Sequence, residues 1–432
     1  MNILVVSTNT LTQPLPVVPI GAGMIYSTLK TAGYDTRFLD LAFQPEPLAA
    51  LRDALVAEPP DLICLSVRNI DNQVIQRPQF FLPFVKEAAE VCRRHSQAPL
   101  VVGGAAMQVM PDEVLAYLGG DFGIQGYGEA ELLRLVGELA AGRADPARKV
   151  RRAATAFYDP YSRLPERSLF ADRYFEPNPR IKKAAMGYQA SRGCSRACVY
   201  CSDGSPHLRG YCRVGAEPFE EDMAVLTRDY QVKSVTFVDG VFNHDIDGTM
   251  VFCETILKSR AVFDWSCALT PAHVSEEMVA LMKRSGCRFV DLGLDTASEE
   301  MIERLGKHYP LPSLFRLAEL LESYEIPYSV SLLFGGPGET RRTVAETIRS
   351  VNRLKPVYVL ASTGIRVYPH TGLYDTAVAE GAIGPEENLL LPRFYQSADF
   401  TPELLAEELA DSAHEYKDMM MKPINERVIP HG

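Results

Sequence analysis

Residues 187–205 read GYQASRGCSRACVYCSDGS and hold three cysteines within eight residues, Cys194, Cys198 and Cys201. Their spacing is CxxxCxxC, and the residues around them are mostly small or polar. Cysteines that only fill a core have no reason to crowd into one glycine-flanked loop. The triplet therefore indicates either cysteines cross-linked to each other or a metal centre, and the rest of the chain has to distinguish the two.

Composition limits the class of protein. A chain of 432 residues is long for one hydrophobic core and predicts two or three domains. Hydrophobic residues make up 47% and charged residues 23%, as in ordinary globular proteins. No apolar run is long enough for a transmembrane helix, and MNILVVSTNT does not resemble a secretory signal. A net charge of −11 argues against a general nucleic-acid binder. Because neither a secretory signal nor a membrane span is recognised, we also expect a cytoplasmic protein without a membrane partner.

From residue 2 to about 142, short apolar stretches alternate with amphipathic ones. The stretches NILVVS, DTRFLDL, DLICLSV, PLVVGG and DFGIQG have the composition of buried strands, and segments such as 78–94 and 129–141 have helical periodicity. Strands separated by helices predict a parallel sheet covered on both faces. We therefore predict an α/β, flavodoxin-like doubly wound domain over residues 1–142, with ligands at the carboxyl ends of its strands.

The alternation breaks at residues 143–183, which are rich in proline, arginine and aromatic residues. We interpret this segment as a linker, whose arginines either bind a phosphate or ribose tail or belong to a solvated crossover. From 184 to 370, six strand–helix repeats predict a partial (β/α)6 barrel with its chemistry at the carboxyl ends of the strands. Residues 371–432 predict a helical extension, clearest in TPELLAEELADSAHEYKDMMM, with Thr401 as its N-cap.

The cysteine triplet follows the first strand of the second block, in a loop where a barrel places its active site. A disulfide is disfavoured because nine cysteines is an odd number and several, such as Cys64 and Cys267, lie in apolar contexts that indicate reduced thiols. A zinc site needs a fourth ligand, which Cys212 could supply. Three thiolates alone are typical of a 4Fe–4S cluster that keeps one iron open, and we favour this interpretation.

The same triplet with an aromatic residue before its third cysteine, here Tyr200, resembles the signature of radical S-adenosylmethionine (radical SAM) enzymes. Four more segments are similar to strands of that superfamily in the expected order: FVDGVFNHD, VDLGLDTASEEMIERLGK, LLFGGPGET and IRVYPHTGLYDTAVAEGAI. Residues 1–142 resemble the cobalamin-binding domain that precedes the radical module in one large subgroup. The resemblance covers roughly residues 1–385, and an ordered set of segments is far more specific than a cysteine triplet.

The resemblance implies that the three thiolates bind three irons and that the fourth iron takes the amino and carboxylate groups of S-adenosylmethionine, which is cleaved to a 5′-deoxyadenosyl radical. It implies an electron donor such as flavodoxin or ferredoxin as a partner. The backbone beside Tyr200 would contact the adenine, or its side chain would shield the cluster. Further contacts are implied at strand ends: Asp239 and Gly240 near the methionine amino group, Gly293 and Asp295 on the fourth strand, Gly335, Gly336 and Glu339 in a glycine-rich turn, and Arg366 and Tyr368 facing adenine or substrate.

Some of these positions also have simpler interpretations. Asp295 precedes ASEEMIERL, where a carboxylate stabilises a helix N-terminus. Glu339 is a common residue at the start of a helix. The segment DGVFN differs from the GGE of other branches, so Asp239 departs from the family pattern at the methionine contact.

Cobalamin-dependent mutases and methionine synthases carry a DxHxxG motif whose histidine binds cobalt, but residues 1–142 have no such motif and one histidine, His95. The resemblance therefore implies cobalamin bound base-off, without a histidine ligand. Arg68 is the candidate neighbour of the cobalt, unless it pairs with Asp71 or Asp40. A domain that binds nothing is the alternative. The candidate cofactor residues of this domain are Arg68, Asn69, Gly103, Gly104, Gly126 and Glu129.

Three functional classes stay open. The favoured one is a cobalamin-dependent radical SAM methyltransferase acting on an unactivated carbon of a small molecule in specialised metabolism. The second is a non-methylating radical enzyme that performs cyclisation, ring rearrangement or another group transfer, with structural or absent cobalamin. The third is a non-catalytic corrinoid-binding sensor, although a sensor needs no intact cluster loop. A tRNA methylthiotransferase is disfavoured, because the first block lacks a second cysteine triplet and no basic tail follows the barrel.

Overall fold

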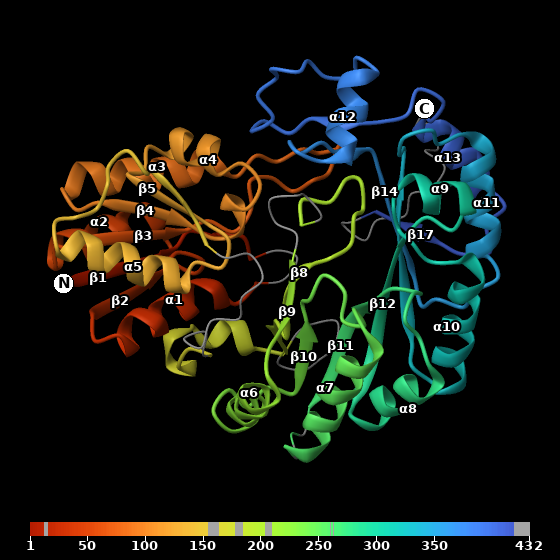
Figure 1. Ribbon diagram of the computed structural model, residues 1–432, viewed down its shortest axis with the longest axis horizontal. Coiled ribbons are helices and arrows are strands. Elements are labelled where there is room, and N and C mark those ends of the chain that lie inside the picture. Colours follow the sequence, from red (N-terminus) through yellow and green to blue (C-terminus); the bar gives the residue numbers. More distant parts are fainter. Residues whose placement is uncertain are drawn as a thin grey trace.

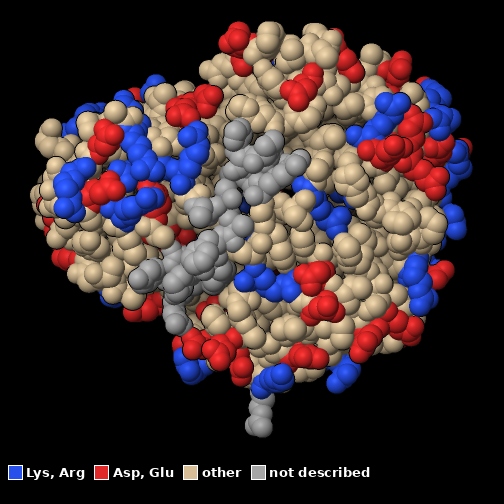
Figure 2. Space-filling view, in the orientation of Figure 1, with Lys and Arg blue, Asp and Glu red and all other residues tan. Residues whose placement is uncertain are grey.

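The computed structural model describes residues 1–12, 16–153, 164–177, 185–203, 210–259, 261 and 263–418. Two α/β units lie side by side, each built on a parallel sheet (Figure 1). Residues 154–163 and 178–183 of the predicted linker, and residue 184 after it, lie outside the described residues. On the face shown in Figure 2, acidic and basic side chains are intermixed over both units. None of the helices in the described ranges is long and apolar enough to span a membrane.

In the described ranges, the first unit is a six-stranded parallel sheet with the order β2-β1-β3-β4-β5-β6. Its strands are β1 (Asn2–Ser7), β2 (Asp35–Asp40), β3 (Leu62–Ser66), β4 (Leu100–Gly103), β5 (Phe122–Gln125) and β6 (Val150–Arg152). The connecting helices are α1 (Ile20–Thr31), α2 (Pro47–Ala57), α3 (Leu82–His95), η1 (Ala105–Met107), α4 (Pro111–Leu118) and α5 (Glu129–Ala140).

Apolar side chains cover both faces of this sheet, as a doubly wound fold requires. On β1, Ile3 and Val5 pack in a cluster with residues of α1 and α5. Leu4 and Val6 point the other way and pack with residues of α2 and α3. The predicted flavodoxin-like arrangement is confirmed, and the strand order reverses between β1 and β3, where such sheets bind their ligands.

The sheet extends past residue 142, because β6 pairs with β5 and places Val150 opposite Gly123. Arg151 is 1% exposed, and its guanidinium contacts Glu138 at 2.5 Å and Glu131 at 3.3 Å on α5. These ion pairs keep a charged strand at the edge of a buried sheet. Part of the segment predicted as a linker therefore belongs to the first sheet.

The second unit is a seven-stranded parallel sheet, as far as the chain is described, in the order β17-β14-β13-β12-β11-β10-β7. Its strands are β7 (Ala185–Tyr188), β10 (Ser234–Phe237), β11 (Asp264–Leu269), β12 (Cys287–Asp295), β13 (Tyr328–Phe334), β14 (Val359–Thr363) and β17 (Tyr416–Lys417). Its helices are α6 (Ala216–Arg228), α7 (Ile246–Lys258), α8 (Glu276–Arg284), α9 (Glu299–Arg304), α10 (Leu311–Ser323) and α11 (Arg341–Val351). The strands follow one another in sequence from β7 to β14, so the sheet is the predicted partial barrel.

Two antiparallel strand pairs lie outside this sheet: β8 (Ser191–Cys194) with β9 (Gly210–Arg213), and β15 (Ile365–Arg366) with β16 (Phe394–Tyr395). Two short 3-10 helices, η2 (Arg167–Leu169) and η3 (Asp172–Phe175), occupy the described part of the predicted linker.

The C-terminal segment contains the helices α12 (Gly372–Ala379) and α13 (Pro402–Leu409). Thr401 caps α13 as predicted, because its hydroxyl accepts a hydrogen bond from the Leu404 N–H at 3.1 Å. The helix is shorter than its sequence pattern suggests and ends at Leu409. The hydroxyl of Ser412 donates to Asn352 at 2.9 Å, and this contact turns the chain back so that β17 joins the sheet beside β14.

The loop after β3, residues 67–81, reaches from the first unit onto the second. Asp71 forms an ion pair with Arg366 at 2.9 Å, and both side chains are buried. The side-chain amide of Gln76 bonds the hydroxyl of Thr363 at the end of β14. We call this contact the seam, and it joins the carboxyl ends of strands from the two units.

Candidate active site

A cavity of about 530 Å³ lies between the two units. Its walls in the first unit come from the loops after β1, β3, β4 and β5, and its walls in the second unit come from β7, the β8–β9 hairpin and the end of β10. This is the edge of the first sheet where the strand order reverses. A ligand of a doubly wound sheet is expected at this edge.

Small residues let the backbone approach this cavity closely. A Cβ atom on Gly103 would meet nothing within 4 Å, so the space beside it is open. Gly104 has a φ of +97°, and a Cβ atom there would lie 2.5 Å from the carbonyl oxygen of Val67. Only glycine fits that position.

Most of the first-unit residues predicted to bind a cofactor line the cavity. Asn69 is exposed and is not among the lining residues. Arg68 has no hydrogen bond or ion pair within the described residues, since Asp71 is paired across the seam and Asp40 accepts from the Tyr174 hydroxyl at 2.7 Å. The expected alternative pairs of Arg68 therefore do not form. The lining residues that were predicted are Arg68, Gly103, Gly104, Gly126 and Glu129.

The cysteine triplet starts at the end of β8 and continues in the loop that follows, where all three thiols are partly exposed. Gly193 has a φ of +74°, and a Cβ atom on it would lie 2.2 Å from the carbonyl oxygen of Gly210. The loop is anchored by backbone bonds: the N–H of Val199 donates to Leu305 at 3.1 Å, and the carbonyl of Val199 accepts from Leu373 at 2.8 Å. The three cysteines are thus presented by an anchored loop.

The cavity and the cysteine loop share a wall. Arg192, which is 3% exposed, forms an ion pair with Glu129 at 2.6 Å. Its guanidinium lies 4.4 Å from the centre of the Tyr127 ring, and the Tyr127 hydroxyl accepts from the N–H of Gly193 at 2.8 Å. The carboxylate of Glu129, predicted for a cofactor, is therefore paired within the protein. The sequence motifs identified the segments that contain Glu129 and Arg192, but they did not indicate that the two segments are in contact.

Tyr200 and Asp295 meet beside the cysteine loop. The Tyr200 hydroxyl donates to a carboxylate oxygen of Asp295, and the ammonium of Lys307 lies 2.5 Å from the same oxygen. Lys307 also donates to the carbonyl of Gly293 at 3.0 Å. Burial raises the pKa of Tyr200 well above 10, so this hydroxyl stays a donor. Lys307, which no sequence pattern singled out, completes this group.

Asp239 supports the hairpin that carries Cys194. It is 5% exposed, and its carboxylate accepts from the Ala190 N–H at 3.3 Å and from the Ser191 hydroxyl. Burial raises the pKa of Asp239 to about 6, although these hydrogen bonds lower it. Gly240, the next residue, differs because a Cβ atom there would meet nothing within 4 Å. Of this predicted pair, Gly240 faces open space, whereas the carboxylate of Asp239 is used in hydrogen bonds within the protein.

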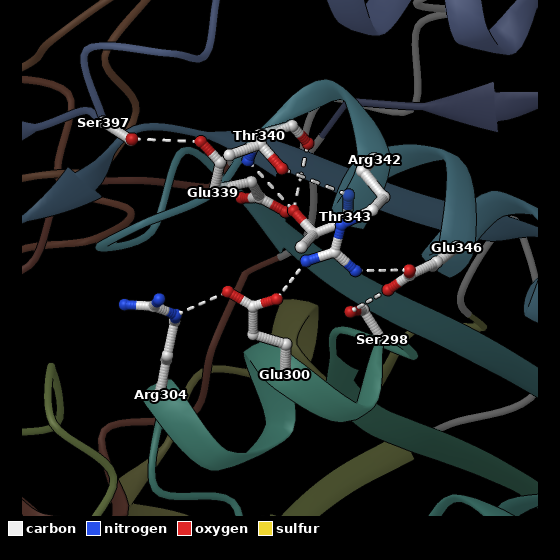
Figure 3. A network of polar contacts seen from close by, with 9 residues as sticks. All are labelled: Ser298, Glu300, Arg304, Glu339, Thr340, Arg342, Thr343, Glu346 and Ser397. Carbon is white, nitrogen blue, oxygen red and sulfur yellow. Dashed lines mark hydrogen bonds and ion pairs between the residues drawn. The ribbon is translucent and has the colours of Figure 1, made fainter.

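Glu339 lies in the turn between β13 and α11 and is 1% exposed. One carboxylate oxygen accepts the N–H groups of Gly335 at 2.5 Å and Gly336 at 3.1 Å, and the other has no hydrogen-bond partner within the described residues. The hydroxyl of Ser397 donates to the Glu339 backbone carbonyl at 3.0 Å (Figure 3). The two glycine N–H groups predicted to face a cofactor are therefore bonded to Glu339.

The helix after this turn is capped by Thr340, whose hydroxyl accepts from the first turn of α11, and not by Glu339. Beyond the cap, Arg342 contacts Glu346 at 2.5 Å, and Ser298 donates to Glu346 at 2.7 Å (Figure 3). This exposed network ties α9 to α11. The interpretation of Glu339 as a helix-start residue is corrected, because its side chain turns inward to the glycines.

Arg366 is 4% exposed and uses its donors inside the protein. It bonds Asp71 at 2.9 Å and the carbonyls of Val367 and Leu389 at 2.7 Å each. The ring of Tyr368 lies beneath it, with the guanidinium 4.8 Å from the ring centre. The predicted role of Arg366 against adenine or substrate does not fit these contacts, which make it a residue of the seam.

Residues 188–351 match the radical SAM superfamily, and residues 7–136 match the B12 binding domain. The chain is a radical SAM protein with a B12 binding domain. The predicted resemblance is confirmed. A radical SAM domain implies a 4Fe–4S cluster and S-adenosylmethionine, and a B12 binding domain implies cobalamin.

Relatives of this radical SAM protein include two enzymes whose names state a methylation. It is 24% identical over 430 residues to the tryptophan 2-C-methyltransferase of Streptomyces laurentii, covering 83% of this chain and 72% of the relative. It is 25% identical over 337 residues to the hopanoid C-3 methylase of Methylococcus capsulatus, covering 74% and 61%. The fold resembles that of TsrM from Kitasatospora setae with tryptophan and a SAM analog bound, at a TM-score of 0.80, 20% identity and coverage of 95% and 88%.

The residues of this radical SAM protein fit the implied groups by their chemistry. Partly exposed thiols on one anchored loop are the donors that iron–sulfur clusters use. The open space beside Gly103 and the required glycine at Gly104 suit a large cofactor held against backbone. Cys212 lies on β9 opposite Arg192. Among the described residues, no three His, Cys, Asp or Glu side chains are gathered to hold a single metal ion.

We expect Glu339→Gln to remove a pH dependence of stability. Burial raises the pKa of Glu339 to about 7, although the Gly335 and Gly336 N–H groups lower it. Because the folded state holds this proton more tightly than the unfolded state, the group stabilises the fold below its ordinary pKa of 4.5, and that stability is lost as the pH rises through about 7. The pKa difference corresponds to roughly 3 kcal/mol.

Urea unfolding at about pH 5 and about pH 8 measures this effect. Between these two pH values, the free energy of unfolding of the wild-type protein should fall by roughly 3 kcal/mol more than that of Glu339→Gln. Glu403→Gln, an exposed glutamate on the adjacent α13, is the control and should follow the wild type. Equal pH dependence of wild type and Glu339→Gln would contradict the assigned burial.

Proposed function

We propose that the protein is a cobalamin-dependent radical SAM methyltransferase that acts on an unactivated carbon of a small molecule. The observation that carries the proposal is the shared wall between the cavity and the cysteine loop. The Arg192–Glu129 ion pair at 2.6 Å and the Tyr127–Gly193 hydrogen bond at 2.8 Å join the cavity wall of the first unit to the hairpin that carries Cys194. This contact supports two cofactor sites that lie next to each other. The names of the two curated relatives, both methylating enzymes, support the same reaction class.

Each group has residues suited to hold it. When bound, the cluster and S-adenosylmethionine supply one-electron chemistry, and cobalamin supplies methyl-group transfer. Cys194, Cys198 and Cys201 would hold the cluster, and Gly103 and Gly104 would let the first unit's backbone contact the corrinoid. The seam and the shared wall hold the two units together through the ion pairs Arg366–Asp71 and Arg192–Glu129.

We further propose that cobalamin binds without a histidine ligand and with its own base displaced. His95, the one histidine of residues 1–142, ends α3 and is exposed, and it is not part of the cavity wall. Arg68 lines the cavity and has no partner in the described ranges. A guanidinium has no lone pair to donate, so Arg68 would lie beside a bound corrinoid without coordinating its cobalt. The absence of a strong axial donor favours cobalt reduction.

The function is tested with anaerobically purified protein and S-adenosylmethionine that carries a deuterated methyl group. Reduced flavodoxin, the class of electron donor we propose, drives the reaction, and tryptophan is the first substrate probe because a relative's name includes it. Mass spectrometry then quantifies deuterated product and 5′-deoxyadenosine. Label transfer supports the proposal, whereas 5′-deoxyadenosine formed with an altered but unlabelled substrate supports the non-methylating class.

The Arg68 proposal predicts a spectroscopic result. The cobalt(II) form of the wild-type protein should show an electron paramagnetic resonance signal without nitrogen superhyperfine splitting. In Arg68→Ala, water should reach the vacated face, change that signal and lower turnover by roughly 10–100-fold, as outer-shell changes at metal sites do. Arg77→Ala, an exposed arginine on the same loop, is the control and should leave both unchanged.

Nitrogen splitting in the wild-type signal would contradict the absence of a nitrogen ligand. An Arg68→Ala variant with an unaltered signal and turnover would contradict only the role assigned to Arg68.

A further inference from the structure

The helices of the second unit lie on the outer side of its sheet (Figure 1). We call the opposite side the open face, because several of its side chains are partly exposed. Along β12, Val290, Leu292 and Leu294 are fully buried, whereas Asp291 and Gly293 between them are partly exposed. Both faces of a parallel sheet are normally covered. An open face on such a sheet is therefore a place for water or a ligand.

The same alternation continues along the neighbouring strands of the open face. On β10, Val235 and Phe237 are buried and Thr236 is exposed. On β11, Ser266 is partly exposed, and its hydroxyl lies 3.0 Å from that of Thr236. The open face therefore carries polar side chains.

This face continues into the cavity between the units. Gly187 on β7 and Val238, the residue that follows β10, line the cavity, and Gly187 is in register with Thr236. Ala268 on β11 is in register with Asp291 on β12. Since neighbouring strands are ~4.8 Å apart, Asp291 lies about two strand spacings, roughly 10 Å, from the cavity wall at the end of β10.

The carboxylate of Asp291 is fixed by hydrogen bonds but has no cationic side chain as a partner among the described residues. Its carboxylate accepts from the Ser329 hydroxyl at 2.6 Å and from the Ser331 hydroxyl at 3.0 Å. Within the described residues, no Lys, Arg or His side chain bonds or pairs with it. Asp295, at the end of the same strand, is paired with Lys307 at 2.5 Å. An ionised Asp291 therefore has no compensating cation among the residues that the structure describes.

Space for a ligand lies next to this carboxylate. A Cβ atom on Gly293, between Asp291 and Asp295 on the open face, would meet nothing within 4 Å. The two serine hydroxyls hold the Asp291 carboxylate in one orientation, and each carboxylate oxygen keeps lone pairs for a further donor. A carboxylate that is fixed, partly removed from water and beside an empty space is suited to a charge-assisted hydrogen bond.

We propose that Asp291, oriented by Ser329 and Ser331, anchors a protonated amine of the substrate in the hollow above Gly293. The inference rests on the proposed function and narrows its substrate class to small molecules that carry an amine. The carbon to be modified would then lie within roughly 10 Å of that amine, between β12 and the cavity wall. The alternative is a purely structural role, in which Asp291 only joins β12 to β13 through hydrogen bonds with the two serines.

Calorimetric binding to the anaerobic, cofactor-loaded protein tests this anchor. The probes are tryptamine, phenethylamine and 1,5-diaminopentane, each compared with an analogue in which a hydroxyl replaces every amine. Wild-type protein should bind at least one amine and prefer it to its alcohol. Asp291→Asn keeps the shape of the side chain and its contacts with the serines. It should weaken the binding of that amine by about 10–100-fold and leave the binding of the alcohol unchanged.

Asp264→Asn is the matched control, because Asp264 lies on the neighbouring β11 and contacts Arg288 at 3.3 Å. It should bind the amines as the wild type does, and thermal unfolding should show that both variants are folded. No amine binding by the wild type, no preference over the alcohols, or equal binding by Asp291→Asn would each overturn the inference.

These outcomes are separate from those of the proposed function. Asp291-dependent amine binding without methyl transfer would refute the function and leave the anchor. Methylation of a substrate that has no amine would refute the anchor and leave the proposed function.

Discussion

Replacing Cys194, Cys198 and Cys201 together with alanine is expected to reduce the iron content of the protein to background and to abolish cleavage of S-adenosylmethionine. These thiols are partly exposed on one anchored loop, whereas Cys253 and Cys287 are fully buried in the barrel core. Burial raises the pKa of Cys253 to about 12, which makes it a poor thiolate donor. Iron and sulfide assays, the optical spectrum and 5′-deoxyadenosine formation measure the effect.

Cys212→Ala is the matched control for the triple replacement. Cys212 lies on β9, outside the anchored loop, and a fourth thiolate would close the iron that S-adenosylmethionine needs. We therefore expect the Cys212→Ala variant to keep its cluster and its activity. A full cluster in the triple variant would refute the assignment of the loop. Stoichiometric zinc that is lost in Cys212→Ala would instead establish the structural zinc site.

Both sheets could be predicted because their strands are nearly continuous apolar runs separated by amphipathic helices. Ile3 to Val6 are buried on alternating faces, which requires helices on both sides and so the doubly wound arrangement. The strand β6 was not apparent, since Arg151 is a charged residue in a short segment. It becomes a strand residue because Glu131 and Glu138 on α5 compensate its charge.

The location of the cavity could also be predicted, because ligand sites of such folds follow the carboxyl ends of parallel strands. The cavity indeed contains Arg68, Gly103 and Gly104. Such glycines can be identified from the sequence because the backbone conformation that requires them is local. Gly104, for example, has a positive φ of +97°.

The roles of charged residues could not be predicted, because their partners are remote in the sequence. Glu129 is bonded to Arg192, 63 residues away. Tyr200 is bonded to Asp295, 95 residues away. A strand-end position shows that a side chain is near the site, but only the fold shows whether another side chain already occupies its donors and acceptors.

Arg366 is the strongest case of this kind, and Arg366→Leu is expected to destabilise the protein by about 3–5 kcal/mol, the usual effect of removing one partner of a buried ion pair. The side chain of Asp71 is 0% exposed, so its carboxylate would stay buried without a cation. Because the pair lies in the seam, its loss should also loosen the contact between the two units. Guanidinium unfolding measures the change in free energy.

Two further variants separate a structural role of Arg366 from a catalytic one. Arg341→Leu removes an arginine whose side chain is 55% exposed and which pairs with Glu407 on α13, so it should cost at most about 1 kcal/mol. Asp71→Asn combined with Arg366→Leu removes the stranded charge and should recover part of the lost stability. An Arg366→Leu variant that unfolds like the wild type but no longer turns over would contradict the seam assignment. In that case its guanidinium would act on adenine or substrate, as its place at a strand end suggests.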